Sequence, residues 1–420
     1  MMNRSSRNDR KAPSQVPRCF PDMLLIVVGL FGVILLAITA QDSFEVMLLP
    51  RRVSRRLRFV SLFYRLTWTA WSALASCCSR NRRRAHLLGV FGALSMVLLF
   101  GVWVAGLILG FGLVLWAVEV GAGVSPPPGF GDQLYMSGVT FFTIGYGDLV
   151  PHSGPARAIT VLEAGTGLGF IAVVIGYLPV LYQLFSRREA AVIRLDGRAG
   201  SPPTAVGLLQ RHGGDDGRGQ IVAFLREWES WGSELLESHL SYPMLGYYRS
   251  QHDDQSWLAA LAVIIDSCAL VLVGLDRVPP LQARMTFTMA RQIVVEMAQS
   301  FGVAPSRYSG GDRLDHDAFL RLKQELAAAG FAWENPDAEE LLAALRATYE
   351  PLLDGLSAYL LLPLPEWMPD EDHRDHWERG PRGTLAGRLV NELTAAGGVV
   401  EHESEPRTRW RRLRSRLGSR

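Results

Sequence analysis

The sequence predicts an all-α membrane protein, and three observations lead to this prediction. Hydrophobic residues make up 48% of the 420 residues, which is a high share for a soluble protein. Three long apolar runs lie in the first half of the chain, and a region with helical periodicity follows them. The expected architecture is an N-terminal extra span, an outer helix, a re-entrant segment, an inner helix and an all-α cytoplasmic domain.

Each apolar run is long enough to cross a bilayer or nearly so. Uncharged runs from Met23 to Ala40 and from Leu87 to Val118 supply the first two spans, since a helix rises ~1.5 Å per residue and the hydrocarbon core is roughly 30 Å thick. A third run extends from Ala158 to Phe185 and ends before Arg187 and Arg188. This arginine pair indicates a cytoplasmic end.

The loop between the first two spans is rich in arginine, which places it in the cytoplasm and the N-terminus outside. Its arginines are Arg51, Arg52, Arg55, Arg56, Arg58, Arg65, Arg80, Arg82, Arg83 and Arg84. Residues 57–76 are predicted to form an amphipathic helix at the membrane surface. An extra span over residues 59–78 would bury Arg65 at a cost of ~2.5 to 3.5 kcal/mol. A cleaved signal peptide ending near Ala40 is a further alternative.

A short apolar stretch between the second and third spans has the composition of a re-entrant loop. The stretch from Leu134 to Phe142 is too short to cross the bilayer, and Thr143-Ile144-Gly145-Tyr146-Gly147-Asp148 follows it. Irregular backbone at membrane depth is tolerated only where protein buries it or water reaches it. To replace the water around K⁺, successive carbonyls must point to one axis, and glycine at positions 145 and 147 permits the positive φ that this requires.

The segment from Thr140 to Asp148, with the sequence TFFTIGYGD, resembles the TxxTxGYGD signature of potassium channels. Residues 87–188 resemble the two-transmembrane pore module of that family, bacterial type. The resemblance implies that Thr143, Ile144, Gly145, Tyr146 and Gly147 form the selectivity filter for K⁺, with Asp148 at its outer mouth and Thr140 supporting it. One filter per chain implies a homotetramer.

Three residues of the third run receive roles on this basis. Some family members carry an acidic residue behind the filter where this chain has Val139, so we hypothesise that Glu163 supplies a substitute carboxylate. Gly167 falls where the family has a pivot glycine, and Pro179 lies in a segment that resembles the kinked region near the gate. The resemblance therefore implies a gating hinge at Gly167 and a gate near Pro179, although glycines also serve close helix packing.

The whole sequence divides into five predicted units: a transmembrane anchor and basic interfacial segment (1–86), the pore module (87–188), a Gly/Pro-rich linker (189–218), a helical cytoplasmic domain (219–406) and a basic tail (407–420). In the domain, helical periodicity is predicted over about 256–275, 281–301, 313–329, 337–361 and 383–396. The first of these helices carries Asp266 at its middle, which favours a buried domain helix over a span.

Composition excludes several other classes of function. A net charge of +2 gives no indication of nucleic-acid binding, and the cysteines show neither paired nor zinc-binding spacing. No nucleophile, catalytic base or phosphate-binding loop is recognisable, so we expect no enzyme activity and no cofactor, with K⁺ as the transported ion. Expected partners are identical subunits, membrane lipids and an unidentified cytoplasmic ligand. A poorly selective cation channel and a membrane-tethered sensor with a vestigial pore remain alternatives.

Overall fold

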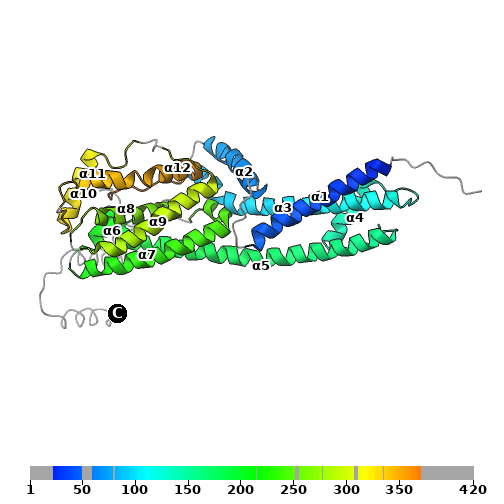
Figure 1. Cartoon of the computed structure of the whole chain (residues 1–420), viewed down its shortest axis with the longest axis horizontal. Helices are drawn as coiled ribbons and strands as arrows, with labels where there is room; N and C mark the ends of the chain where they lie inside the picture. The colour runs from blue at the N-terminus through cyan, green and yellow to red at the C-terminus, as the bar shows by residue number, and fades with distance from the viewer. Residues whose placement is uncertain are drawn as a thin grey trace, which may run out of the picture.

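The computed structural model describes residues 22–369 except 50–58, 79–80, 214, 251–254, 277, 307–310 and 334. These residues form helices and turns, with an isolated bridge between Leu275 and Trp333. The molecule is elongated, with apolar helices at one end and a helical domain at the other (Figure 1). The prediction of an all-α membrane protein with an extra N-terminal span is confirmed.

Among the described helices, three are long and apolar enough to cross a membrane: α1 (Asp22–Met47), α3 (Asn81–Gly121) and α5 (Gly154–Ala199). The short helix α4 (Phe130–Phe141) lies between α3 and α5 and packs against both. The three apolar runs of the sequence are thus helices, each extending beyond its predicted bounds.

Small residues allow α1 and α3 to touch backbone to backbone. A Cβ atom on Gly32 would lie 2.9 Å from the carbonyl oxygen of Gly110, and a Cβ on Gly106 would lie 2.9 Å from Thr39 Oγ1. Such close approach is a common way for membrane helices to associate, because lipid offers them no hydrophobic driving force. The two helices run antiparallel, since the N-terminal half of α1 lies beside the C-terminal half of α3.

The inner helix α5 does not end at Phe185 as predicted. It continues to Ala199 as one helix of 46 residues, about 69 Å at the usual rise and therefore much longer than the roughly 30 Å hydrocarbon core. Its last turns belong to the helical domain. Arg188 does not mark a surface, because its side chain is 3% exposed and is bound by protein groups.

The predicted linker over residues 189–218 is largely helical and packed. Gly200 ends α5 with φ 97°, and the Thr204 side chain accepts a hydrogen bond from the Gly207 amide at the start of α6 (Ala205–Arg211). A Cβ on Gly207 would lie 2.5 Å from the Ala199 carbonyl oxygen, so this glycine lets α6 pack on the end of α5. Gly200 is therefore a helix cap and Gly207 a contact point, and this explains why a Gly-rich composition mimicked a linker here.

The helical domain surrounds one apolar helix. Its further elements are α7 (Asp215–Ser241), η1 (Pro243–Tyr247), α8 (Trp257–Leu272), α9 (Pro280–Phe301), α10 (His316–Ala328), α11 (Ala338–Arg346) and α12 (Glu350–Leu360). Nearly every side chain of α8 is buried, which agrees with the prediction of a domain helix. The helix predicted over 337–361 is instead two helices, because Pro351, in the first turn of α12, has no amide hydrogen with which to continue α11. The run over 383–396 lies outside the described residues, as does the basic tail.

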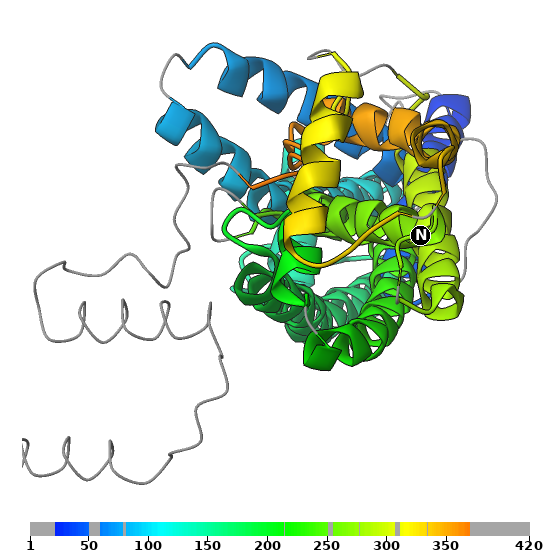
Figure 2. The same ribbon diagram turned by 90° about the vertical axis from the view of Figure 1, so that its left-hand side faces the viewer.

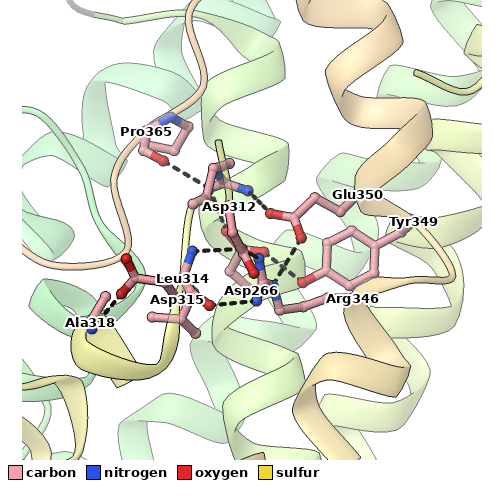
Figure 3. Close-up of polar contacts among 10 residues, drawn as sticks. Asp266, Asp312, Leu314, Asp315, Ala318, Arg346, Tyr349, Glu350 and Pro365 are labelled. Carbon is pink, nitrogen blue, oxygen red and sulfur yellow. Dashed lines mark hydrogen bonds and ion pairs between the residues drawn. The ribbon is translucent and has the colours of Figure 1, made fainter. Parts of the chain in front are cut away.

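A buried polar cluster joins α8, α11 and the start of α12 within the helical domain (Figure 3). Arg313 donates to Asp266 Oδ2 at 2.9 Å and to Glu350 Oε1 at 3.1 Å, and the Tyr349 hydroxyl donates to Asp266 Oδ1 at 2.7 Å. Arg346 joins the same Glu350 at 2.8 Å. The charge of Asp266 at the middle of α8 is therefore paired within the domain.

Helix α2 (Phe59–Ser76) coincides with the predicted interfacial helix and is not among the candidate spans of the described chain. One face packs on the domain, where the Trp68 indole donates to the Tyr359 carbonyl at 2.8 Å. The opposite face exposes Leu62 and Leu66. Seen along the long axis, α2 lies on the opposite side of the molecule from α5 and α7 (Figures 1 and 2).

Candidate pore and filter

Helix α4 is held between α3 and α5 at its middle. The Ser137 hydroxyl lies 2.8 Å from the Ile108 carbonyl oxygen of α3 and hydrogen-bonds the Glu163 carboxyl group of α5. A Cβ on Gly112 would lie 3.2 Å from the Cα of Leu134, so α3 and α4 meet closely. These contacts fix the orientation of α4 and therefore the position at which residues 142–148 begin.

The segment after α4 begins as the C-terminal cap of that helix. The Ile144 amide donates to the Val139 carbonyl at 2.9 Å, and the Thr143 amide donates to the Thr140 carbonyl at 3.0 Å. Thr143 itself is left-handed, with φ 55°. This is the Schellman arrangement, which usually has glycine at the left-handed position. A threonine there stores of the order of 1 to 3 kcal/mol of strain, which the contacts of α4 must offset.

Positive φ recurs at every second residue of this segment. Thr143, Gly145 and Gly147 have φ values of 55°, 62° and 78°, whereas Ile144 and Tyr146 between them do not have positive φ. Alternation between left-handed and ordinary backbone turns successive carbonyls toward the same side, which regular helix or strand does not do. A row of carbonyl oxygens on one side is suited to binding a dehydrated cation.

Apolar and aromatic side chains of the same segment are exposed on the single chain. Tyr146 is 71% exposed and Ile144 is 50% exposed, and every residue from 142 to 150 falls in the exposed class. An apolar surface of this kind is typical of an interface.

Asp148 has a partner that the sequence did not predict. The Tyr135 side chain of α4 lies beside the Asp148 carboxyl group. Glu163, the predicted substitute, lies elsewhere: it is fully buried at the contact of α4 with α5 and hydrogen-bonds Ser137. A tyrosine four residues before Val139 was the available signal, but its significance depends on the path of the chain after α4.

The structure gives Gly167 a packing role. A Cβ at this position would overlap with the Phe141 carbonyl oxygen at the end of α4, so any side chain would push the inner helix away from the segment. Pro179 lies farther along the same helix, is exposed, and leaves α5 continuous. The hinge and gate roles of these residues stay predictions.

Glu119 anchors the other end of the segment. Its carboxylate is fully buried and accepts hydrogen bonds from the amides of His152 and Ser153 at 3.1 and 2.9 Å. The Ser153 hydroxyl also donates to it at 2.9 Å and caps the start of α5. A carboxylate at a helix N-terminus is electrostatically favourable. The sequence showed only a lone acidic residue just after the apolar run.

No group of three or more His, Cys, Asp or Glu side chains in the described part of the chain is arranged to bind a metal ion. The polar groups of the pore region bridge helices or cap them. The feature suited to binding a cation is the backbone of residues 143–147.

This combination of outer helix, short re-entrant helix, capped extended segment and inner helix defines an ion-channel module within a membrane protein. Comparison of the sequence with known families gives the same result: the model described as "Ion channel" matches residues 103–183. This match agrees with the resemblance inferred from the filter motif, over residues 103–183.

The chain is also similar to the "Uncharacterized membrane protein YdjJ" of Bacillus subtilis (strain 168), with 29% identity over 150 residues. The match covers 36% of this chain and 43% of that relative. No solved structure matches the chain. The ion-channel family therefore describes the pore region, and the comparisons assign nothing to the helical domain.

Proposed function

We propose that the protein is a subunit of a potassium-selective channel that conducts K⁺ passively through a homotetrameric pore. The observation that carries this proposal is the alternation of positive φ at Thr143, Gly145 and Gly147, directly after a helix whose end is fixed between two candidate spans. Carbonyl oxygens aligned in this way replace the hydration shell of K⁺. Tyr146 and the flanking glycines match the signature of potassium filters rather than that of a general cation pore.

Exposure of the filter segment supports the homotetramer. A single chain supplies one row of carbonyls, and a closed ring around an ion needs several rows. The exposed Ile144 and Tyr146 side chains, together with exposed residues of α5 such as Val161 and Leu168, give identical subunits an apolar surface to bury.

The proposed channel function also gives roles to the surrounding residues. Thr140 supports the filter through its carbonyl, which caps the turn at Thr143. Asp148, which lies beside Tyr135, stands at the outer mouth. Helix α4 is the pore helix in this proposal, and Glu163 fixes it through the hydrogen bond with Ser137. Gly167 and Pro179 lie on the inner helix α5, which would carry the gate.

Orientation follows from the distribution of charge. The helical domain lies at the opposite end of α5 from the filter, and the C-terminal end of α1 points toward the domain (Figure 1). In the sequence, the arginine-rich segment 51–58 follows α1. Arginine-rich segments stay on the cytoplasmic side. We therefore place the protein in the plasma (inner) membrane with the domain in the cytoplasm, where an unidentified signal would gate the pore.

A flux assay tests the proposal. The full-length protein is reconstituted in liposomes, and K⁺ uptake is compared for the wild type, Gly145→Ala and Gly131→Ala. Gly145 needs positive φ, whereas Gly131 lies in the first turn of α4, where a Cβ would meet open space. We expect K⁺ flux from the wild type and Gly131→Ala, and loss of it in Gly145→Ala because alanine disfavours positive φ.

Two other results of this assay would favour an alternative function. Equal uptake of Na⁺ and K⁺ would indicate a poorly selective cation channel. An assembled protein that passes neither ion would indicate a membrane-tethered sensor with a vestigial pore.

A further inference from the structure

A short turn of the helical domain is inserted between the outer and inner helices of the pore. The turn, residues 242–248, contains η1 and is called the η1 turn below. On one side the Tyr177 hydroxyl of α5 lies 3.3 Å from Met244 Sδ. On the other side the Tyr248 ring packs so closely on α3 that a Cβ on Gly92 would lie 2.8 Å from it.

Arg188 binds the inner helix to this turn. Its guanidinium donates to the Leu245 carbonyl at 2.8 Å and to the Tyr248 carbonyl at 2.7 Å. Glu189 accepts from its Nε at 3.0 Å, and the Phe185 ring lies under the group at 5.2 Å. The side chain is 3% exposed, so these protein groups replace water around the charge.

The neighbouring His239 completes the set of acceptors. Its Nδ1 lies 2.9 Å from the Leu235 carbonyl oxygen, which can only accept, so Nδ1 carries the proton. Nε2 is then free to accept from Arg188 Nη1 at 3.3 Å. Each nitrogen of the guanidinium thus has a partner, and the planar fork of arginine is the side chain that can reach all of them.

The opposite face of the η1 turn is bound to the rest of the domain. The Tyr247 ring stacks on Tyr64 of α2 at 5.4 Å, and its hydroxyl lies 3.0 Å from that of Tyr359 in α12. Phe301 of α9 lies 5.5 Å away, and a Cβ on Gly246 would overlap with its ring. A displacement of α2, α9 or α12 therefore moves this turn.

We propose that the η1 turn is the mechanical link through which the helical domain sets the position of the inner helix, and that Arg188 is the positioning residue that holds α5 to it. Because α5 is continuous from Arg188 back to Gly167 beside the end of the pore helix, a shift at the turn reaches the ion pathway. This inference rests on the proposed channel function and adds the route of its regulation.

Single-channel recording of the full-length tetramer in planar bilayers tests the link. Arg188→Gln removes most donors of the fork, and Arg187→Gln is its matched control because the adjacent Arg187 is exposed and the change in charge is the same. We expect Arg188→Gln to change the open probability by about tenfold, since hydrogen bonds to a buried charge are lost. Arg187→Gln should match the wild type, and Arg188→Lys should lie between the two. Unitary K⁺ conductance should stay constant, because the filter is untouched.

A second pair of variants removes no hydrogen bond. It tests the role of the η1 turn even if Arg188→Gln does not assemble. Gly92→Ala presses on the Tyr248 ring, whereas a Cβ on Gly89, one turn away on α3, meets open space. Gly92→Ala should shift the open probability at unchanged conductance, and Gly89→Ala should not.

Absence of K⁺ current from the wild type would overturn the channel function, and this inference with it. Wild-type currents together with unchanged open probability in Arg188→Gln and Gly92→Ala would overturn the inference alone. If Arg188→Gln does not assemble, an unchanged open probability in Gly92→Ala overturns it.

Discussion

At Gly167 the inner helix passes so close to the pore helix that a methyl group does not fit. Alanine there would meet the Phe141 carbonyl oxygen, whereas at Gly169 a Cβ meets open space. We expect Gly167→Ala to lower the stability of the folded protein by about 1 to 3 kcal/mol through overpacking and to reduce conduction, with Gly169→Ala close to wild type. Thermal unfolding and flux of both variants check this. A Gly167→Ala tetramer of wild-type stability would favour the hinge role instead.

Glu163 is the second residue whose contribution depends on its place behind the pore helix. Its Oε1 contacts Ser137, and its Oε2 is buried without a hydrogen-bond partner among the described residues. Glutamine at this position would bury amide donors without acceptors, a cost of roughly 1 to 3 kcal/mol. We expect Glu163→Gln to lower both K⁺ conduction and the heat stability of the tetramer. Wild-type values in both measurements would contradict a role in filter support.

His239 makes stability depend on pH. Burial beside Arg188 lowers the pKa of His239 from 6.5 to about 3, so the folded protein keeps it neutral while the unfolded chain takes up a proton. Stability is therefore complete above the unfolded pKa and falls as the pH drops toward the folded one, by at most ~1.4 kcal/mol per pH unit. Denaturant unfolding between about pH 5 and pH 7.5 should show this slope.

In His239→Gln the slope should be smaller. Burial also lowers the pKa of His212, so some dependence remains in the variant. An identical slope in wild type and variant would show that His239 titrates normally.

At the scale of elements, the polar cluster joins α8, α11 and α12. Arg313 and Asp266 are 3% and 2% exposed, and removing one charge leaves the other buried. Arg313→Met should destabilise the domain by about 3 to 5 kcal/mol. The exposed pair Arg194 and Glu227 provides the control, since Arg194→Met should cost no more than about 1 kcal/mol.

Thermal unfolding of both variants tests this difference. Adding Asp266→Leu to Arg313→Met should restore part of the lost stability, because no unpaired charge is then buried. Equal effects of Arg313→Met and Arg194→Met would contradict the model of a buried cluster.

The sequence predicted those elements whose chemistry is local. Uncharged runs identified the spans, and the order of Thr143, Gly145, Tyr146 and Gly147 identified the re-entrant segment. The predicted linker failed because Gly200 and Gly207 make close contacts that only the packing of α6 on α5 reveals.

Contacts between residues that are far apart in the sequence could not be predicted from sequence patterns. Arg188 was predicted to mark the cytoplasmic end of the third span, but its side chain is buried and donates to carbonyls of a turn more than fifty residues away. Tyr135 lies beside Asp148, and Glu119 accepts a hydrogen bond from the Ser153 amide. Both contacts join residues that are distant in the sequence. Contacts between distant positions need coordinates, because composition and spacing carry no information about which surfaces meet.

At the scale of the whole molecule, the continuous helix α5 runs from the filter region into the helical domain (Figure 1). Helix α5 packs on the pore helix at Gly167, on the η1 turn at Arg188 and on α6 at its end. Apolar side chains around the filter segment, among them Ile144 and Tyr146, are exposed on one chain, and identical subunits would bury them. The candidate filter, the inner helix and the helical domain thus lie along one continuous helix.

Selection of K⁺ by the backbone of residues 143–147 can be measured through the reversal potential of the reconstituted protein with K⁺ on one side of the bilayer and Na⁺ on the other. Selective coordination by the aligned carbonyls predicts a potential that follows the K⁺ gradient and shifts toward zero when the filter is altered at Gly145. A wild-type reversal potential near zero, with both ions carrying current, would contradict the account.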